Sequence, residues 1–350
     1  MKNENLTYTC QNCGGEVRFD VRAQKFLCTA CKTEYQAETE TDVVTEKKFN
    51  EQKLVVSSTE LSDVSTATCD NCGSEIFFPA GETAAHCPMC GASRLRAGAA
   101  KAAIRPDGIV PFKIDAQEAQ NGFRKFISKR FFAPSALKNA FQEGKLDGWY
   151  LPFWTFDADA NGTYTGEGGR DVKVTKDGKE TTERQWIPVR GNVSKSFDDM
   201  LVCASRKESD SLVLRLGSYD TSEVKPYSGQ YLQGYMAEFR TIEAAESYEE
   251  AKTRMQNSLE AEARADICRT YSASRNVRVN ALFSNITCKS ILLPLYRACY
   301  TYKGKVYDYT INGQTGAVSS DYPKSALKIF LTILSIAAVI AGIVLLTKLH

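Results

Sequence analysis

Cysteines in a repeated spacing are the residues of this chain best suited to chemistry. Eight of its twelve cysteines form two copies of one pattern, in which two C-x-x-C pairs are separated by fourteen residues. The copies begin 59 residues apart, at Cys10 and at Cys69. The eight residues are Cys10, Cys13, Cys28, Cys31, Cys69, Cys72, Cys87 and Cys90.

Four thiolates at this spacing suit a tetrahedral zinc ion. Each C-x-x-C places two sulfurs on one side of a turn, and the intervening residues can run out and back as two short strands. Iron is the chemical competitor, because the same sulfur geometry suits it. Four cysteines leave no open position for water or substrate, so each ion is predicted to be structural. We expect two zinc ribbons, at 8–36 and 67–95, with a linker at 37–66.

The remaining cysteines stand alone in apolar or helical contexts, which is typical of small buried side chains. They are Cys203, Cys268, Cys288 and Cys299. The first ten residues, MKNENLTYTC, lack the apolar core of a secretory signal. The cysteine-bearing part is therefore expected in a reducing cytoplasm.

Charge is distributed unevenly along the 350 residues. The first hundred carry ten Lys/Arg and fourteen Asp/Glu, whereas 101–145 carry nine basic and four acidic residues. Phosphate binding needs clustered basic side chains, so the acidic ribbons argue against nucleic acid as a partner. The basic residues cluster in one predicted helix, as Arg124, Lys125, Lys129 and Arg130. They indicate either a solvated helix face or contact with anionic lipid headgroups or an acidic partner.

The segment 104–322 is predicted to be an α+β body with a mainly antiparallel sheet. Asp115 and Glu118 form a capping-box pattern at the start of a helix. A second short helix is expected to end at Gly144, and a long one at 242–268 carries apolar residues at helical spacing. Asp177-Gly178 lies between alternating segments and predicts a hairpin turn.

Signals for catalysis are weak in this body. The stretch TGEGGRD is glycine-rich but lies between strand patterns, so we interpret it as a loop rather than a phosphate-binding site. Asp157 and Asp159 are predicted to lie together on a solvated strand face. Pro152 and Pro294 are predicted to begin strands, either as parts of a duplicated half-domain or independently. No catalytic residue is proposed, and we expect a protein that is not an enzyme.

The segment 326–347 is predicted to be a single transmembrane helix. Ile329 to Leu346 is a run of eighteen residues without a charge, which approaches the length that crosses a bilayer. Lys324 and Lys328 precede this run, and by the positive-inside rule they favour a cytoplasmic N-terminal body. The expected location is the cell membrane, with a C-terminal tail anchor.

Several stretches resemble a known bacterial family. They are the paired ribbons, the apolar C-terminal helix, IVPFKIDAQEA, GWYLPFWTFDADANGTYTGEGG, PYSGQYLQGYMAEF and ILLPLYRACYTYKGKVYDYTINGQTGAV. The chain is similar to the YdjG-like family of TFIIB-type zinc-ribbon membrane proteins. This resemblance implies a membrane-anchored component of an envelope-stress system, with SPFH-domain or phage-shock-type proteins as partners.

The function expected from these observations is that of a tail-anchored cytoplasmic adaptor that recruits or scaffolds partner proteins at the membrane. The alternative is a membrane-tethered nucleic-acid-binding zinc-ribbon protein. Salt-dependent binding to DNA or RNA distinguishes the two, because binding to phosphates releases counterions.

Overall fold

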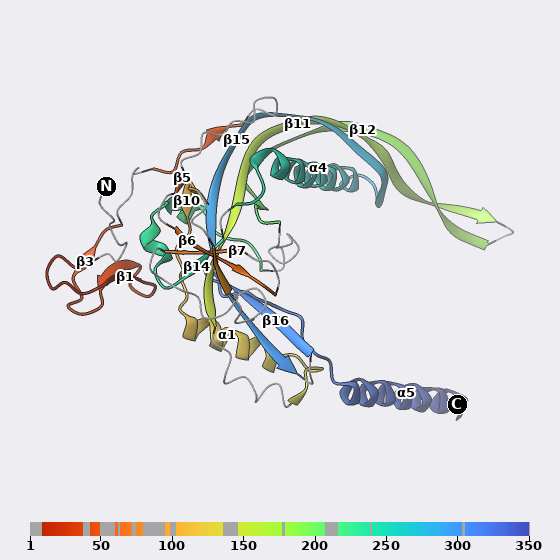
Figure 1. The fold of residues 1–350 in the computed structure, drawn as a ribbon. Helices are drawn as coiled ribbons and strands as arrows, with labels where there is room; N and C mark the ends of the chain where they lie inside the picture. The colour runs from red at the N-terminus through yellow and green to blue at the C-terminus, as the bar shows by residue number, and fades with distance from the viewer. Residues whose placement is uncertain are drawn as a thin grey trace.

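The computed structural model describes most of the chain. The described residues are 9–37, 43–49, 60–61, 64–71, 75–79, 95–98, 103–135, 146–176, 179–206, 216–238, 240–302 and 305–349. Within these ranges, helices and a mainly antiparallel sheet confirm the predicted mixed α and β class, with one apolar C-terminal helix (Figure 1). The predicted short helix that ends at Gly144 falls largely outside the described residues.

Four antiparallel strands form the centre of the body. They are β11 (Asp147–Lys176), β12 (Lys179–Cys203), β15 (Ala273–Tyr302) and β16 (Lys305–Asn312), in the spatial order β12-β11-β15-β16. Lys176 pairs with Lys179, as a hairpin between β11 and β12 requires, and the predicted turn residues Asp177 and Gly178 lie outside the described residues. Beyond Gly169, where its pairing with β15 ends, β11 pairs with β12 as an arm made of 170–176 and 179–185.

The long strands curve around the helix α4 (Ala244–Cys268) (Figure 1). The register between strands shifts near Asp157 and again near Thr165. Three non-glycine residues with positive φ lie opposite these shifts: Asp199 (49°), Asn276 (54°) and Asn285 (53°). Such bulges bend a strand and increase its twist. The sheet therefore presents a concave face, and the predicted apolar stripe of α4 is fully buried there.

A helix followed by a strand pair occurs twice in the body. The helix α1 (Ala116–Ser128) precedes β11 and β12, and α4 precedes β15 and β16. The strand segments that contain Pro152 and Pro294 pair directly with each other, with Leu151 opposite Leu293. Helix α4 packs on β11, β12 and β15, and Phe123 of α1 stacks on Tyr309 of β16 with ring centroids 3.9 Å apart. This arrangement favours the duplicated half-domain.

Helix α1 begins as its sequence predicts. The Asp115 side chain accepts a hydrogen bond from the Glu118 amide at 2.8 Å, and the Glu118 side chain accepts one from the Asp115 amide at 3.1 Å. Ala119, Phe123 and Ile127 form its buried face. This face packs against β15 and β16, and it orients the exposed side of α1 away from the sheet.

Short elements complete the fold. The first ribbon contains β1 (Val17–Asp20), β2 (Lys25–Cys28) and β3 (Glu34–Tyr35). The region of the predicted second ribbon contains β6 (Val64–Cys69), β7 (Glu75–Pro79) and β8 (Leu95–Gly98). The others are β4 (Lys47–Lys48), β5 (Glu60–Leu61), β9 (Ala103–Ile104), β10 (Gly108–Ile109), η1 (Thr221–Glu223), β13 (Lys225–Pro226), η2 (Gly229–Leu232), β14 (Met236–Ala237) and β17 (Val318–Ser320). Two short pairings, β10 with β15 and β14 with β11, are parallel.

The predicted loop at TGEGGRD was wrong, because these residues lie inside β11. The glycines here make room for side chains that cover the strand. A Cβ on Gly168 would lie 2.4 Å from the Tyr271 ring, and a Cβ on Gly166 would lie 3.2 Å from Ile267 Cδ1. Glycine in this strand therefore reflects the close approach of the end of α4 rather than a turn.

Two further expectations differ from the structure. Pro152 and Pro294 lie within β11 and β15 rather than at their starts, and Pro152 pairs with Leu292. Part of the predicted linker joins the body: Lys47–Lys48 pairs with β15, and Phe49 is buried beside Phe156 and Tyr248. Phe49 anchors this segment because its ring fills a gap between the sheet and α4.

The isolated cysteines divide into two groups. Cys203 and Cys288 are buried, as expected. Cys268 is exposed at the last residue of α4, where its thiol lies 3.6 Å from the Ser274 hydroxyl. The prediction was wrong for Cys268, because the helix ends there and turns its last residue to solvent. The side chain of Cys299 lies outside the described set.

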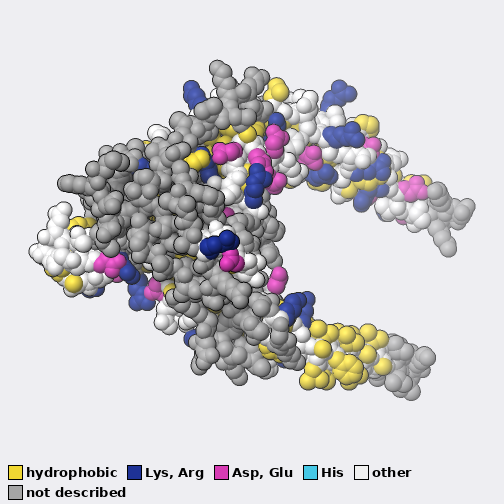
Figure 2. Space-filling view, viewed as in Figure 1, with side chains coloured by type: hydrophobic (Ala, Val, Ile, Leu, Met, Phe, Trp, Pro, Cys, Tyr) yellow, Lys and Arg dark blue, Asp and Glu magenta, His cyan; other side chains and the backbone are white. Residues whose placement is uncertain are grey.

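The C-terminal helix α5 (Ala326–Leu349) leaves the body beside the end of α1 (Figure 1). Figure 2 shows it as an apolar rod, whereas basic and acidic side chains both cover the arm of β11 and β12. In this view, the arm and α5 project toward the same side.

Candidate metal centre

The two C-x-x-C pairs of the first ribbon form the same backbone turn. In one, the Gly14 amide donates to the Cys10 carbonyl at 2.8 Å, and in the other the Lys32 amide donates to the Cys28 carbonyl at 3.1 Å. Gly14 and Lys32 both have positive φ, at 74° and 61°. Glycine adopts this conformation readily. The matching turns aim both pairs of sulfurs into one space.

The four sulfurs of this ribbon fit one tetrahedral ion. Those of Cys10, Cys13, Cys28 and Cys31 all lie within 4.8 Å of one another. The Cys10–Cys31 and Cys13–Cys28 sulfur separations are each 3.5 Å. Sulfurs about 2.3 Å from a tetrahedral zinc ion lie about 3.8 Å apart. The cluster can therefore bind a metal ion, and its geometry is compatible with the predicted zinc ribbon.

Hydroxyl groups favour the thiolate form of two of the four cysteines, whereas the neighbouring sulfurs raise the pKa of Cys13 to about 12. The Tyr35 hydroxyl donates to the Cys10 sulfur at 3.0 Å and lowers the pKa of that thiol. The Thr33 hydroxyl, 3.0 Å from the Cys31 sulfur, lowers the pKa of Cys31 to about 6. Because the thiolate is the metal-binding form, these contacts prepare the ligands and fix their orientation.

The second cysteine set falls mostly outside the described residues. Cys69 ends β6 and is fully buried. The other three predicted ligands, Cys72, Cys87 and Cys90, are not described. A second metal site is therefore not evident among the described residues.

The first ribbon packs against the body instead of hanging free from a linker. The Phe26 ring lies 4.8 Å from the Tyr231 ring, and the Phe19 ring lies 5.1 Å from it. Gln24 donates to the Phe112 carbonyl at 2.8 Å. This docking was not predicted, because the alternating apolar residues of the ribbon also suit an isolated pair of strands.

A carboxylate cluster (Glu46, Asp157 and Asp199) was also missed. Its oxygens lie within 4.8 Å of one another. Lys289 is 2.7 Å from both Glu46 and Asp199, so it supplies the positive charge that such a set requires. These contacts attach the Glu46 segment to the sheet. Because the Lys289 ammonium already neutralises these carboxylates, we interpret the cluster as a structural ion-pair network rather than a metal site.

The pKa values of two carboxyls in this cluster shift in opposite directions. The Thr287 hydroxyl lies 2.6 Å from Glu46 and 2.7 Å from Asp157, but it can donate to only one of them. Burial, together with the neighbouring Glu46 carboxyl, raises the pKa of Asp157 to about 6. The hydrogen bond with Asp157 lowers the pKa of Glu46 to about 2. Asp157 is thus half-buried and protonated near neutral pH more often than an ordinary aspartate.

Asp159 does not join this cluster. Its carboxylate accepts hydrogen bonds from Ser196 at 2.7 Å and from Asn285 at 2.8 Å. Asp157 and Asp159 lie on the same, less buried face of β11, alternating with the buried Phe156, Ala158 and Ala160, as predicted. Their hydrogen-bond partners differ, because Asp157 accepts from the Asp199 amide at the bulge.

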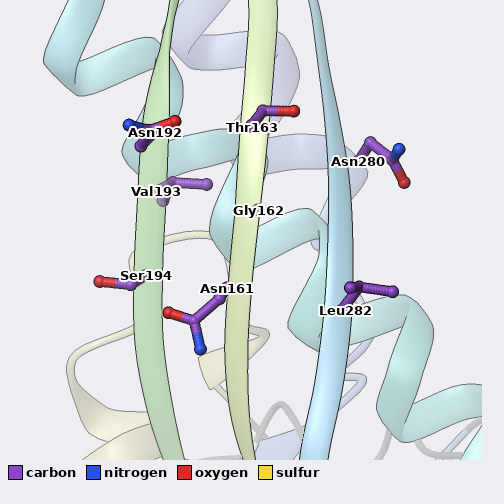
Figure 3. A pocket seen from close by; sticks show the side chains of 8 residues that line it. All are labelled: Asn161, Gly162, Thr163, Asn192, Val193, Ser194, Asn280 and Leu282. Atoms are coloured by element: carbon purple, nitrogen blue, oxygen red, sulfur yellow. The ribbon is translucent and has the colours of Figure 1, made fainter.

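A cavity of about 630 Å³ lies over the middle of the three long strands (Figure 3). Its lining consists of Asn161, Gly162, Thr163, Asn192, Val193, Ser194, Asn280 and Leu282. Figure 3 shows uncharged amide, hydroxyl and aliphatic side chains in this lining. With no acid, base or nucleophile pair among them, these residues supply no acid–base chemistry.

The predicted basic residues lie on the exposed side of α1 and at its C-terminal end, away from the cysteine cluster. The Arg130 guanidinium lies 4.3 Å from the Phe126 ring centre and 5.9 Å from that of Tyr322. All four basic side chains, Arg124, Lys125, Lys129 and Arg130, are exposed.

The predicted membrane segment is a continuous helix. Ala326–Ile343 has a mean hydropathy of 2.3, and none of this span is buried. A core helix of a soluble protein would be covered, so the exposure supports a membrane-spanning helix.

The chain is similar to a protein of Bacillus subtilis (strain 168) described as uncharacterized protein YdjG. The two are 26% identical over 327 residues, which cover 93% of this chain and 92% of that protein. This similarity supports the predicted resemblance of the chain to YdjG-like proteins. No protein-family model matches the chain, and no solved structure matches it.

Proposed function

We propose that this protein is a tail-anchored cytoplasmic adaptor that holds partner proteins at the membrane. In this proposal both cysteine sets are TFIIB-type ribbons with structural zinc, and α5 is the anchor. The protein would act in an envelope-stress response rather than as an enzyme. The resemblance to zinc-ribbon membrane proteins suggests SPFH-domain or phage-shock-type partners.

One observation carries the proposal: a ribbon is docked on a body that bears an uncovered apolar helix. The cysteine cluster has four protein ligands and leaves no position for substrate. Its metal would therefore stabilise a surface, and α5 would place that surface beside the membrane. A rigid surface at a fixed location is what an adaptor requires.

The arm constrains how the anchor would enter a bilayer. The arm carries charged side chains such as Lys173 and Glu183 and projects on the same side as α5 (Figure 2). Charged groups are excluded from the hydrocarbon core. Under this proposal, α5 would be tilted so that the arm lies over the membrane surface, where it could meet proteins located there.

Photo-crosslinking in native membranes tests the proposal. A photoreactive residue at Asn12, on the exposed part of the first ribbon, is expected to capture a membrane-associated protein. The same substitution at Ala261, on the exposed side of α4, is the control for non-specific capture. Replacing both Cys28 and Cys31 by serine should abolish the Asn12 adduct, because the ribbon surface then loses its shape.

Two outcomes would contradict the adaptor. One is the absence of any protein adduct specific to Asn12. The other is submicromolar binding of DNA or RNA by the full chain in detergent, with affinity that falls steeply as salt rises. The second outcome would favour the membrane-tethered nucleic-acid-binding protein.

A further inference from the structure

The segment after α1 is attached to the first turn of α5. The Lys328 ammonium donates to the carbonyls of Ala133 at 2.7 Å and of Phe131 at 3.1 Å. The Ser325 amide donates to the Phe132 carbonyl at 2.8 Å. The apolar span begins at Ala326. These hydrogen bonds therefore hold Phe131 and its neighbours at the level where the apolar surface of α5 starts.

Aromatic side chains gather at this level, and one of them, Phe131, has little protein cover. Phe131 is 66% exposed, although it is large and apolar. The Lys328 ammonium lies 5.9 Å from its ring centre. Tyr322, partly exposed, lies just before α5 and faces the Arg130 guanidinium. Exposed aromatic rings next to cations at the end of an apolar helix are typical of the membrane–water interface.

Positive charge surrounds these rings. Lys129, Arg130 and Lys324 are exposed, as are Arg124 and Lys125 one turn earlier. Within the part of the chain that the structure describes, none of these five forms an ion pair with a carboxylate. Figure 2 shows Lys and Arg side chains where the apolar helix leaves the body. Their charge is thus available to an anionic surface.

We propose that the α1–α5 junction (129–133 with 322–328) binds anionic phospholipid headgroups of the membrane that α5 enters. The inference rests on the proposed insertion of α5. Phe131 lies among the outermost acyl carbons, while Lys129, Arg130 and Lys324 contact the phosphates. Lipid is the favoured occupant over an acidic protein, because the patch is continuous with the apolar surface of α5. The contact holds α1, and through it the docked ribbon, at a fixed height above the bilayer.

The test uses the full chain in nanodiscs that contain equal amounts of phosphatidylglycerol and phosphatidylcholine. A benzophenone amino acid replaces Phe131, and in a matched variant it replaces Leu282, which is 79% exposed on the long sheet. We expect lipid adducts at position 131, at least threefold enriched in phosphatidylglycerol, and a tenfold lower yield at position 282. A protein adduct or no lipid adduct at 131 would overturn the inference.

Charge variants test the headgroup contact separately. Replacing Lys129, Arg130 and Lys324 by glutamine should remove the phosphatidylglycerol enrichment at position 131. The matched control replaces Lys173, Arg184 and Arg190 by glutamine and should leave it unchanged. Enrichment that survives the junction variant would refute the role of these cations.

Alkaline carbonate extraction separates this inference from the proposed function. Release of the full chain would refute membrane insertion, and with it the adaptor. Retention of the chain without a lipid adduct at position 131 would refute the junction contact alone.

Discussion

Arg22 of the first ribbon forms an ion pair with Asp115, the N-cap residue of α1, with Nη2 and Oδ2 2.5 Å apart. The other oxygen of the same carboxylate accepts the Glu118 amide that starts the helix. One side chain therefore caps α1 and holds the ribbon against it. Because α1 ends beside α5, the ribbon and the membrane helix are joined through a single helix.

Substitutions at Asp115 separate these two roles. Asp115→Asn keeps a good cap and removes the ion pair, so it should lower the free energy of unfolding by less than about 1 kcal/mol, since the Arg22 side chain is 70% exposed. Asp115→Ala should cost about 1 kcal/mol more. Both losses can be measured by urea unfolding of the full chain in detergent, monitored by circular dichroism. Lys25→Gln, at an ion pair within the ribbon, is the control. Equal losses in the two Asp115 variants would refute the capping role.

Gly15→Ala should weaken metal binding by the first ribbon. A Cβ at this position would lie 3.1 Å from the Ala30 Cβ and 3.2 Å from the Cys28 sulfur, so it would push on the ligand set. We expect at least a tenfold loss of zinc affinity in competition with a chromophoric chelator. Gly14→Ala meets no atom within 4 Å and strains only the backbone, so it should weaken binding less. The reverse order of the two variants would contradict the packing argument.

Removal of the first metal should loosen the ribbon from the body. The wild-type chain is expected to hold two zinc ions, and replacing Cys28 and Cys31 by serine should leave one, as measured by elemental analysis. Because Phe26 packs on Tyr231, hydrogen exchange should rise in 17–28 and in 229–235. The α4 segment provides the internal control, since it lies in a separate apolar cluster. Unchanged exchange in 229–235 would show that docking is independent of the metal.

Asp157→Asn should change how stability depends on pH. The pKa of Asp157 is raised from an ordinary 3.8 to about 6, so the folded chain holds a proton that the unfolded chain releases. This proton stabilises the fold below that range, and the stabilisation is lost as pH rises from about 4 to about 6.

The pKa of Glu46, lowered from 4.5 to about 2, acts in the opposite direction, mainly below pH 4.5. Between pH 4.5 and 6.5, the free energy of unfolding of the wild type should therefore fall by on the order of 1 kcal/mol because of this group, after a discount for partial solvent exposure. In thermal unfolding, the Asn variant should lack this fall. Asp159→Asn serves as the control. An unchanged slope in the Asp157 variant would contradict the raised pKa of this carboxyl.

Lys289→Met should destabilise the body strongly. Only 11% of the Lys289 side chain is exposed, and its removal leaves Glu46 and Asp199 without a counter-charge. A loss of about 2–4 kcal/mol is expected from chemical unfolding. Lys195→Met, at the half-exposed pair with Glu262, should cost less than about 1 kcal/mol. Adding Glu46→Gln to Lys289→Met should restore part of the loss, and a further loss would contradict the charge argument.

Local patterns in the sequence were sufficient for several features. The capping box at Asp115, the apolar stripe of α4, the hairpin at 177–178 and the apolar span of α5 each depend on residues a few positions apart. The Cys10–Cys31 ligand set is also local, because two tight turns and a short strand pair bring it together. Such features can be predicted because neighbouring residues determine them.

Features that depend on distant partners could not be predicted. Glycines at 166 and 168 lie within a strand because Ile267 and Tyr271 occupy the space above them. Asp157 is drawn into a charged cluster by Glu46, more than one hundred residues earlier in the chain. The docking of Phe26 on Tyr231 likewise joins residues that have no relation in sequence. In each case the surroundings of the residue are determined by a residue distant in the sequence, and the local sequence pattern does not reveal that residue.

The direct pairing of Leu151 with Leu293 makes the body an internal dimer in which each half supplies the strand that the other half lacks. A single half would expose the inner edge of its long strand, which is a hazard for aggregation. Chains expressed separately as 1–206 and 216–350 should therefore recognise each other and reassemble. In the intact chain, the covalent link between the halves would raise their effective concentration.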